Sequence, residues 1–123
     1  ADPHALRRAV VGVDLEEVSR FRGKSTVFLS KIFTPEEQHY CNEKPIPEQH
    51  YAARFCAKEA FIKALSGLSG FSQSIVLTEI GVYNDEQGFP KISYEREQGI
   101  VSKLSLSHDR TKAMAVVIVS RDV

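Results

Sequence analysis

The chain has no excess of either charge, few cysteines and no long hydrophobic run. Each of these absences excludes some classes of protein. Its 123 residues carry 16 Lys and Arg against 16 Asp and Glu. No large net field therefore attracts it to nucleic acid or to a membrane surface, and we expect neither as a partner. No apolar run approaches the length that spans a bilayer. Any charged partner must be recognised by a local patch.

Cysteine offers little chemistry of its own. Cys41 and Cys56 are the two thiols, and their spacing fits no metal-binding motif. No secretory signal sequence is recognisable, so we expect reduced thiols and a cytoplasmic protein. The chain also lacks a Walker phosphate loop and a Gly-x-Gly-x-x-Gly motif, which argues against ATPase and dehydrogenase functions.

The length favours one domain, because a second would leave neither with a useful hydrophobic core. We expect a single domain over residues 1–123, with Ala1–Pro3 as a processing remnant outside the fold. No internal repeat or low-complexity segment interrupts it.

Helical patterns dominate the first half of the chain. An apolar, β-branched run predicts a strand at 9–13, and residues 15–21 and 25–33 read as helices. Thr34 is followed by a proline and two acids, which is a strong signal for a helix start. That helix should end near Asn42.

The most informative segment is the helix at 51–65, which follows a two-proline loop at 43–48 and should stop at Gly67. Alanines recur there at steps of three and four residues, so they share a face against which another element packs closely. Charged side chains flank that face. They are either surface charges that stabilise the helix or the chemistry of a phosphate site. The alanines are Ala53, Ala57, Ala60 and Ala64, and the charged residues are Arg54, Lys58, Glu59 and Lys63.

Strand patterns fill the second half. Residues 75–83 and 90–94 predict two strands joined by a turn at 84–90, and 103–108 with 113–120 predict a final hairpin. Helices first and strands later, after one opening strand, favour an α+β domain. We expect an antiparallel sheet packed against the long helix.

Two polar residues end predicted strands. Asp14 falls at a strand-to-helix junction, where it is either an N-cap or a carboxylate that anchors a hard cation such as Mg²⁺. His108 shares a strand face with Leu104 and Leu106. It is either a hydrogen-bonded structural histidine or part of a site.

Four pieces of the sequence, in this order and spacing, resemble the holo-acyl carrier protein synthases, which are 4′-phosphopantetheinyl transferases. The lysine–glutamate helix motif is the specific one, whereas a Gly-x-Asp piece or the turn is common alone. Cys56 stands where this family usually has alanine. The four pieces are Gly12-Val-Asp14, Arg54-Phe-Cys-Ala-Lys-Glu-Ala-Phe-Ile-Lys63, Asn84-Asp-Glu-Gln-Gly-Phe-Pro90 and Leu104-Ser-Leu-Ser-His108.

The resemblance implies transfer of the 4′-phosphopantetheine arm of coenzyme A to a serine of an apo-acyl carrier protein, with release of 3′,5′-ADP, for fatty acid biosynthesis. It also implies a divalent metal, Mg²⁺ or Mn²⁺, and a homotrimer whose neighbours share active sites. Two other functions stay open: a metal-dependent pyrophosphate hydrolase and a non-catalytic coenzyme A-binding subunit.

The same resemblance implies a role for particular residues. Asp14 and Glu59 would bind the metal, and Glu59, Lys63 and His108 would be catalytic. Three groups could accept the proton of the serine: Glu59 through a water, His108, or a hydroxide on the metal. The expected coenzyme-binding residues are Arg54, Lys58, Gly67, Asn84, Gly88, Pro90 and His108, and the expected carrier-docking residues are Arg20, Arg22 and Lys24.

Overall fold

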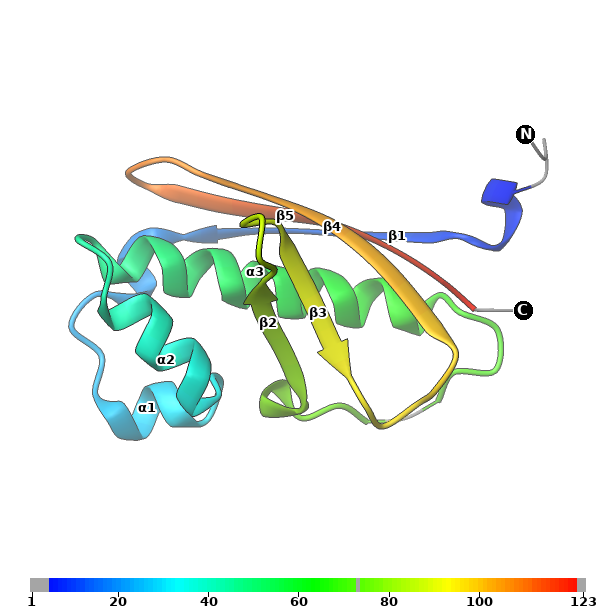
Figure 1. Ribbon diagram of the computed structural model, residues 1–123, viewed down its shortest axis with the longest axis horizontal. Coiled ribbons are helices and arrows are strands. Elements are labelled where there is room, and N and C mark those ends of the chain that lie inside the picture. Colours follow the sequence, from blue (N-terminus) through cyan, green and yellow to red (C-terminus); the bar gives the residue numbers. More distant parts are fainter. Residues whose placement is uncertain (1–4, 73, 122–123) are drawn as a thin grey trace.

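The computed structural model describes residues 5–72 and 74–121, so the expected remnant Ala1–Pro3 lies outside the described residues. A long helix, α3 (Pro47–Ser66), forms the centre of the fold (Figure 1). A three-stranded antiparallel sheet lies along it, and a two-stranded antiparallel sheet crosses it. The α+β prediction is confirmed, with the strands divided between two sheets. The first sheet has the order β1 (Val10–Glu17), β5 (Lys112–Arg121), β4 (Ile100–His108), and the second pairs β2 (Ile80–Asn84) with β3 (Pro90–Tyr94).

Helix α3 is buried on nearly all sides in its middle, where every side chain from Tyr51 to Lys58 is buried. The sheet covers one side, and α2 (Pro35–Asn42) and β2 pack on another. On the sheet side the predicted alanine face brings two backbones together. A Cβ added at Gly12 of β1 would lie 1.9 Å from the Ala60 carbonyl oxygen, so only glycine fits there. This close approach sets the following residue on the same strand face, Asp14, against α3.

The opening strand is longer than predicted. β1 continues to Glu17 and is followed by a short 3-10 helix, η2 (Val18–Phe21), so the helix predicted for 15–21 is wrong over its first half. Asp14 lies inside the strand opposite Ala115, not at its end. The pairing with β5 decides this, because a long-range partner strand overrides a weak local preference for helix.

Most other boundaries agree with the sequence patterns. Thr34 and Glu37 form a reciprocal capping box at the start of α2, with N···O distances of 3.2 and 2.8 Å, and α3 ends at Gly67. The final hairpin is confirmed and longer than predicted. Two elements are shorter than their patterns. They are α1 (Thr26–Ser30) and β2, because a 3-10 turn, η3 (Leu77–Glu79), replaces the first part of the strand predicted at 75–83. A further 3-10 turn, η1 (Ala5–Arg8), precedes β1. Among the described residues, no helix is both long and apolar enough to span a bilayer.

One face of the three-stranded sheet packs on α3, and the opposite face is open to solvent in the single chain (Figure 1). The inward row of β5 is buried, from Ala113 to Val119 at alternate positions. The outward positions of the sheet are also largely apolar. They include Val11, Val13, Leu15, Val101, Met114 and Ile118, each at least 39% exposed.

Candidate active site

A carboxylate cluster forms where β1 passes α3. Asp14 is only 8% exposed, and its Oδ1 accepts a hydrogen bond from Lys63 Nζ at 3.0 Å. Lys63 also donates to the Val13 carbonyl at 3.0 Å. The other oxygen of Asp14, Oδ2, is buried and has no hydrogen-bond partner among the described residues. A buried carboxylate oxygen without a donor is costly, so this atom points to a missing positive group.

Glu59 faces the same gap from α3. Its burial and the negative charge of Asp14 raise the pKa of the Glu59 carboxyl above its ordinary value, against the opposing charge of Lys63. The hydrogen bond with Asp14 raises the pKa of Lys63. Two ionised carboxylates at close range repel each other, and a divalent cation between them removes this repulsion.

The donor set fits a hard cation with a partly open coordination shell. Within residues 5–72 and 74–121, no three histidine, cysteine or acidic side chains gather closely enough to enclose a metal. Asp14 and Glu59 would therefore supply one or two oxygens, and substrate phosphates and water the others. That is the usual arrangement for Mg²⁺ and does not resemble a closed structural site.

A cleft of about 310 Å³ opens on the other side of α3. Arg54 dominates it: the guanidinium is 3% exposed, donates to Asn84 Oδ1 at 2.6 Å and lies 3.9 Å above the Tyr40 ring. Pro90 and His108 also line this cleft. Four of the residues expected to bind coenzyme A therefore meet in one place.

The turn between β2 and β3 is shaped to hold Asn84 against Arg54. Asn84 Nδ2 donates to the Gly88 carbonyl at 3.0 Å, and Asp85 Oδ1 accepts from two backbone N–H groups, those of Gln87 and Phe89. Gly88 has φ of 91°, a value that side chains disfavour. It shapes the turn and does not itself line the cleft.

The two regions lie at opposite edges of the three-stranded sheet. Asp14 of β1 pairs with Ala115 of β5, which pairs with Leu106 of β4. Neighbouring strands are about 4.8 Å apart, so these rows place the β1 and β4 residues roughly 10 Å apart across the face that α3 covers. Lys63 turns toward β1 and Arg54 toward β4. The helix therefore stands between the carboxylates and the cleft.

The sequence comparisons connect these two regions to a known family. Residues 10–118 match the family model described as the 4′-phosphopantetheinyl transferase superfamily. The chain belongs to this superfamily. Two relatives named holo-[acyl-carrier-protein] synthase are 39% identical (Geobacter sp. strain M21, 89% of this chain and 96% of the relative) and 41% identical (Trichlorobacter lovleyi, 88% and 94%).

Solved structures of the family have the same fold. A holo-(acyl-carrier-protein) synthase from Bacillus anthracis in complex with coenzyme A (3′,5′-ADP) matches with a TM-score of 0.75 at 27% identity, over 91% of this chain and 96% of that one. The enzyme from Neisseria meningitidis matches with a TM-score of 0.75 at 30% identity, over 91% and 98%.

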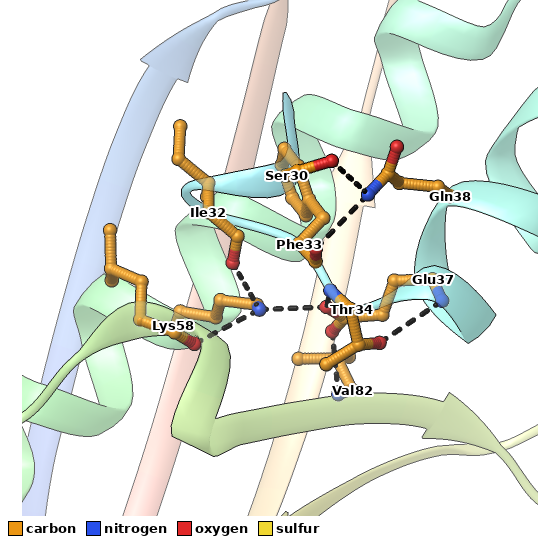
Figure 2. Close-up of polar contacts among 9 residues, drawn as sticks. Ser30, Ile32, Phe33, Thr34, Glu37, Gln38, Lys58 and Val82 are labelled. Carbon is orange, nitrogen blue, oxygen red and sulfur yellow. Dashed lines mark hydrogen bonds and ion pairs between the residues drawn. The ribbon is translucent and has the colours of Figure 1, made fainter. Parts of the chain in front are cut away.

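Lys58 of this transferase lies outside the Arg54 cleft, and its burial argues against the expected role in binding the coenzyme. The side chain is fully buried, and Nζ donates to the Ile32 carbonyl (2.6 Å), Glu37 Oε1 (2.7 Å) and the Leu77 carbonyl (3.1 Å), as Figure 2 shows. Burial lowers the pKa of Lys58 from its ordinary value, and the Glu37 carboxylate opposes that shift. Glu37 Oε2 in turn accepts from the Val82 N–H at 2.8 Å. Lys58 thus ties α3 to α2 and to the start of β2.

Gly67 also lies away from the Arg54 cleft. It ends α3 and borders a separate cavity of about 500 Å³ that Arg7, Arg8 and Arg121 line. A Cβ at Gly67 would lie 2.6 Å from Val10 Cγ1, so close packing against β1 is sufficient to explain this glycine.

The expected docking residues are exposed and follow β1. Arg20 donates to Glu16 Oε1 at 2.7 Å, and its guanidinium lies 4.8 Å from the Phe55 ring centroid. Arg22 is 3.8 Å from Glu48, and Lys24 lies over the Phe28 ring at 5.5 Å. Arg20 acts on the Glu59 carboxylate and so lies near the carboxylate cluster.

Cys56 lies beneath Asp14. Its thiol donates to the Ala113 carbonyl at 3.3 Å, and burial, followed by the charge of Asp14, raises the thiol pKa to about 12. Cys41 is buried as well, and burial raises its pKa to about 12. Both are free thiols without thiolate character, so the departure from alanine at Cys56 is a change of packing.

Sequence reasoning missed three polar residues of this region. Glu16 is the next residue after Asp14 on the inner strand face, and burial together with Asp14 raises its pKa. In the helix predicted for residues 15–21, the Glu16 side chain would have pointed away from Asp14. His50 and Tyr40 line the Arg54 cleft. His50 precedes Arg54 by four residues, so helical spacing alone could have indicated it.

Proposed function

We propose that this chain is a holo-acyl carrier protein synthase that transfers the 4′-phosphopantetheine arm of coenzyme A to a serine of an apo-acyl carrier protein and releases 3′,5′-ADP. One observation carries the proposal most strongly. The specific family motif on α3 sets Glu59 and Lys63 beside Asp14, whose buried Oδ2 has no donor among the described residues. A diphosphate held through a divalent cation satisfies that arrangement.

Asp14 and Glu59 would hold Mg²⁺ or Mn²⁺, which supplies charge neutralisation at the pyrophosphate when bound. Lys63 is half exposed, so its ammonium is free to move from Asp14 to a phosphate oxygen. Its positive charge there stabilises the negative charge that develops on the transferring phosphate. Glu59 is the side chain beside the pyrophosphate suited to receive the serine proton, whereas His108 lies in the Arg54 cleft.

The Arg54 cleft is suited to the nucleotide end of coenzyme A. Asn84 fixes the guanidinium through a 2.6 Å hydrogen bond, and Pro90 forms an apolar wall beside it. A fixed guanidinium binds phosphate oxygens with little loss of side-chain entropy. Arg54, Asn84, Pro90 and His108 are therefore the coenzyme-binding residues that we propose, with Gly88 shaping the turn.

We further propose a homotrimer in which neighbours share sites. Helix α3 separates the carboxylates from the cleft within one chain, so a coenzyme that reaches both is more easily accommodated between two chains. The open sheet face supports this, because exposed Val13, Leu15, Met114 and Ile118 form an apolar surface suited to a partner copy. The chain then acts as one transferase domain in the cytoplasm, in fatty acid biosynthesis.

The basic surface of Arg20, Arg22 and Lys24 is the carrier-docking surface in this proposal. Acyl carrier proteins are acidic, so complementary charge would speed association and orient the acceptor serine toward the carboxylate cluster. The surface directly follows β1, which supports a short path from docked carrier to Asp14.

The direct test is incubation with coenzyme A, Mg²⁺ and an apo-acyl carrier protein, followed by mass spectrometry of the carrier. The expected result is the mass of the added arm, with 3′,5′-ADP in the supernatant. Release of nucleotide without transfer would indicate a pyrophosphate hydrolase. Binding without either product would indicate a non-catalytic coenzyme A-binding subunit.

Shared sites have a test of their own. Glu59→Gln and Arg54→Ala chains should each be inactive, and mixing them by refolding should restore activity if the two residues come from different chains. Random assortment would restore about a quarter of the sites. If mixing restores nothing, although both variants form trimers, the site lies within one chain.

A further inference from the structure

His50 stands in the Arg54 cleft without an assigned role. Its ring is 5.4 Å from the His108 ring, centroid to centroid, in an edge-to-face arrangement with an interplanar angle of 67°. His50 also meets the Tyr40 ring at 6.0 Å, edge to face. Two imidazoles from α3 and β4 thus line one cleft, with the Tyr40 ring beneath.

The charged groups that act on His50 are all basic. Arg54 faces it from the same helix, His108 from β4 and Lys44 from the loop before α3. Burial, followed by these neighbours, lowers the pKa of His50 from its ordinary value. Tyr40 lies between two of the cations, with Lys44 Nζ at 4.4 Å and Arg54 Cζ at 3.9 Å from its ring centroid.

Asp109, which follows His108 in the sequence, uses its carboxylate to stabilise a turn. Asp109 Oδ1 accepts hydrogen bonds from the backbone N–H groups of Thr111 and Lys112, both at 2.9 Å, and so stabilises the β4–β5 turn. The cleft therefore collects positive and protonatable groups, and none of the described residues that line it is acidic. Such a cluster is stable in the protonated form only with an anion bound.

We infer that His50 is a further recognition residue for the phosphomonoester of coenzyme A, which its protonated imidazole holds beside His108. This rests on the proposed function, because the pyrophosphate then belongs to Asp14, Glu59 and Lys63 at the other edge of the sheet. The phosphomonoester is the remaining anionic group of that substrate. An imidazolium at His50 is repelled by Arg54 and Lys44, and a dianion in the cleft offsets that repulsion.

A defined pH dependence follows. The bound phosphate raises the pKa of His50, so protons are taken up on binding. The resulting gain in affinity is fully present below the pKa of the free protein and is lost as pH rises through the pKa of the complex. For each proton taken up, the affinity falls about tenfold for every unit by which pH rises in that window. The phosphate itself stays mainly dianionic above about pH 6.

The experiment measures 3′,5′-ADP binding calorimetrically from pH 6.5 to 8.5, in buffers of different ionisation enthalpy, to count the protons taken up. The variants are His50→Phe, which keeps a ring but takes no proton, and His50→Gln, with His39→Gln as a matched control. His39 is exposed on α2 and pairs with Glu43 outside the cleft. 5′-ADP, which lacks the 3′-phosphate, serves as the control ligand.

We expect about one more proton to be taken up by the native protein and by His39→Gln than by either His50 variant. Affinity for 3′,5′-ADP should fall about tenfold near pH 6.5 in both His50 variants, with little change for 5′-ADP. Thermal unfolding of each variant checks that it is folded. Unchanged proton uptake and affinity in a folded His50 variant would overturn the role of His50 and leave the proposed function intact. A native protein that neither binds 3′,5′-ADP nor modifies a carrier would overturn both.

Discussion

Replacing Lys58 by methionine tests the most buried charge in the fold. The ammonium is 0% exposed and holds three oxygens, those of Ile32, Glu37 and Leu77, at 2.6 to 3.1 Å. Methionine fills the space but leaves two carbonyls without a donor and a buried carboxylate without its cation. Breaking a buried pair in this way costs about 3–5 kcal/mol.

A free-energy cost of this size can be measured by equilibrium unfolding. A domain of this kind has about 5–15 kcal/mol of total stability, so the variant should remain folded but be easily denatured. We expect the free energy of unfolding in guanidinium to fall by about 3–5 kcal/mol, and the midpoint of thermal unfolding by roughly 10–20 °C. Lys31→Met, at an exposed lysine before α2, should change either by little.

A second substitution separates charge from packing. In Lys58→Met, the Glu37 carboxylate still accepts hydrogen bonds from the N–H groups of Thr34 and Val82 but has no cation beside it. Glu37→Gln removes this unpaired charge and keeps one side-chain oxygen as an acceptor. Lys58→Met with Glu37→Gln should therefore recover part of the lost stability. A cost below about 1 kcal/mol for Lys58→Met would refute the structural role. Native stability with lost affinity for 3′,5′-ADP would show that Lys58 binds phosphate after all.

Three other changes test the remaining parts of the proposal. Glu59→Gln should lower turnover by about 10²-fold or more while preserving the circular dichroism spectrum; a near-normal rate would contradict its role. Because the pKa of Glu59 is raised on folding, the folded metal-free protein binds a proton there more readily than the unfolded chain does. Its stability relative to Glu59→Gln should therefore rise as pH falls from 7 toward 5. A stability difference that does not change with pH would oppose the assignment. Arg20→Glu should slow transfer through weaker, salt-sensitive carrier association with coenzyme A binding retained, and an unchanged salt dependence would count against docking there. Ile118→Asp on the open sheet face should dissociate the proposed trimer in sedimentation, whereas Val27→Asp, at a more exposed valine on α1, should not.

The elements with local signals were predictable. Thr34, Pro35 and Glu37 carry a helix start within four residues, and Gly67 marks the end of α3. The alanine face was readable from spacing, and the structure uses it for the contact with β1 at Gly12. Such signals need only neighbours in the sequence, which is why they hold without knowledge of the fold.

What failed depended on distant parts of the chain. Lys58 sits in a charged helix motif, and nothing local distinguishes it from Glu59 and Lys63. Its burial is set by Ile32, Glu37 and Leu77, which arrive from other elements. In the same way, β5 decides that β1 continues past Asp14, and with it that Glu16 joins the inner face.

The separation of the two regions could not be read from motifs either, although it governs how the chemistry is assembled. Motif order places Glu59 and Arg54 five residues apart on one helix, which suggests a single site. Five residues correspond to about 500° of helical rotation, so the two side chains point to different sides of α3. The sheet order then carries Asp14 to one edge and His108 to the other, because β5 pairs between β1 and β4. A helix that presents its acid to one edge and its guanidinium to the other is suited to completing sites with its neighbours. In the proposed homotrimer, the open apolar face of the sheet would bring those neighbours together.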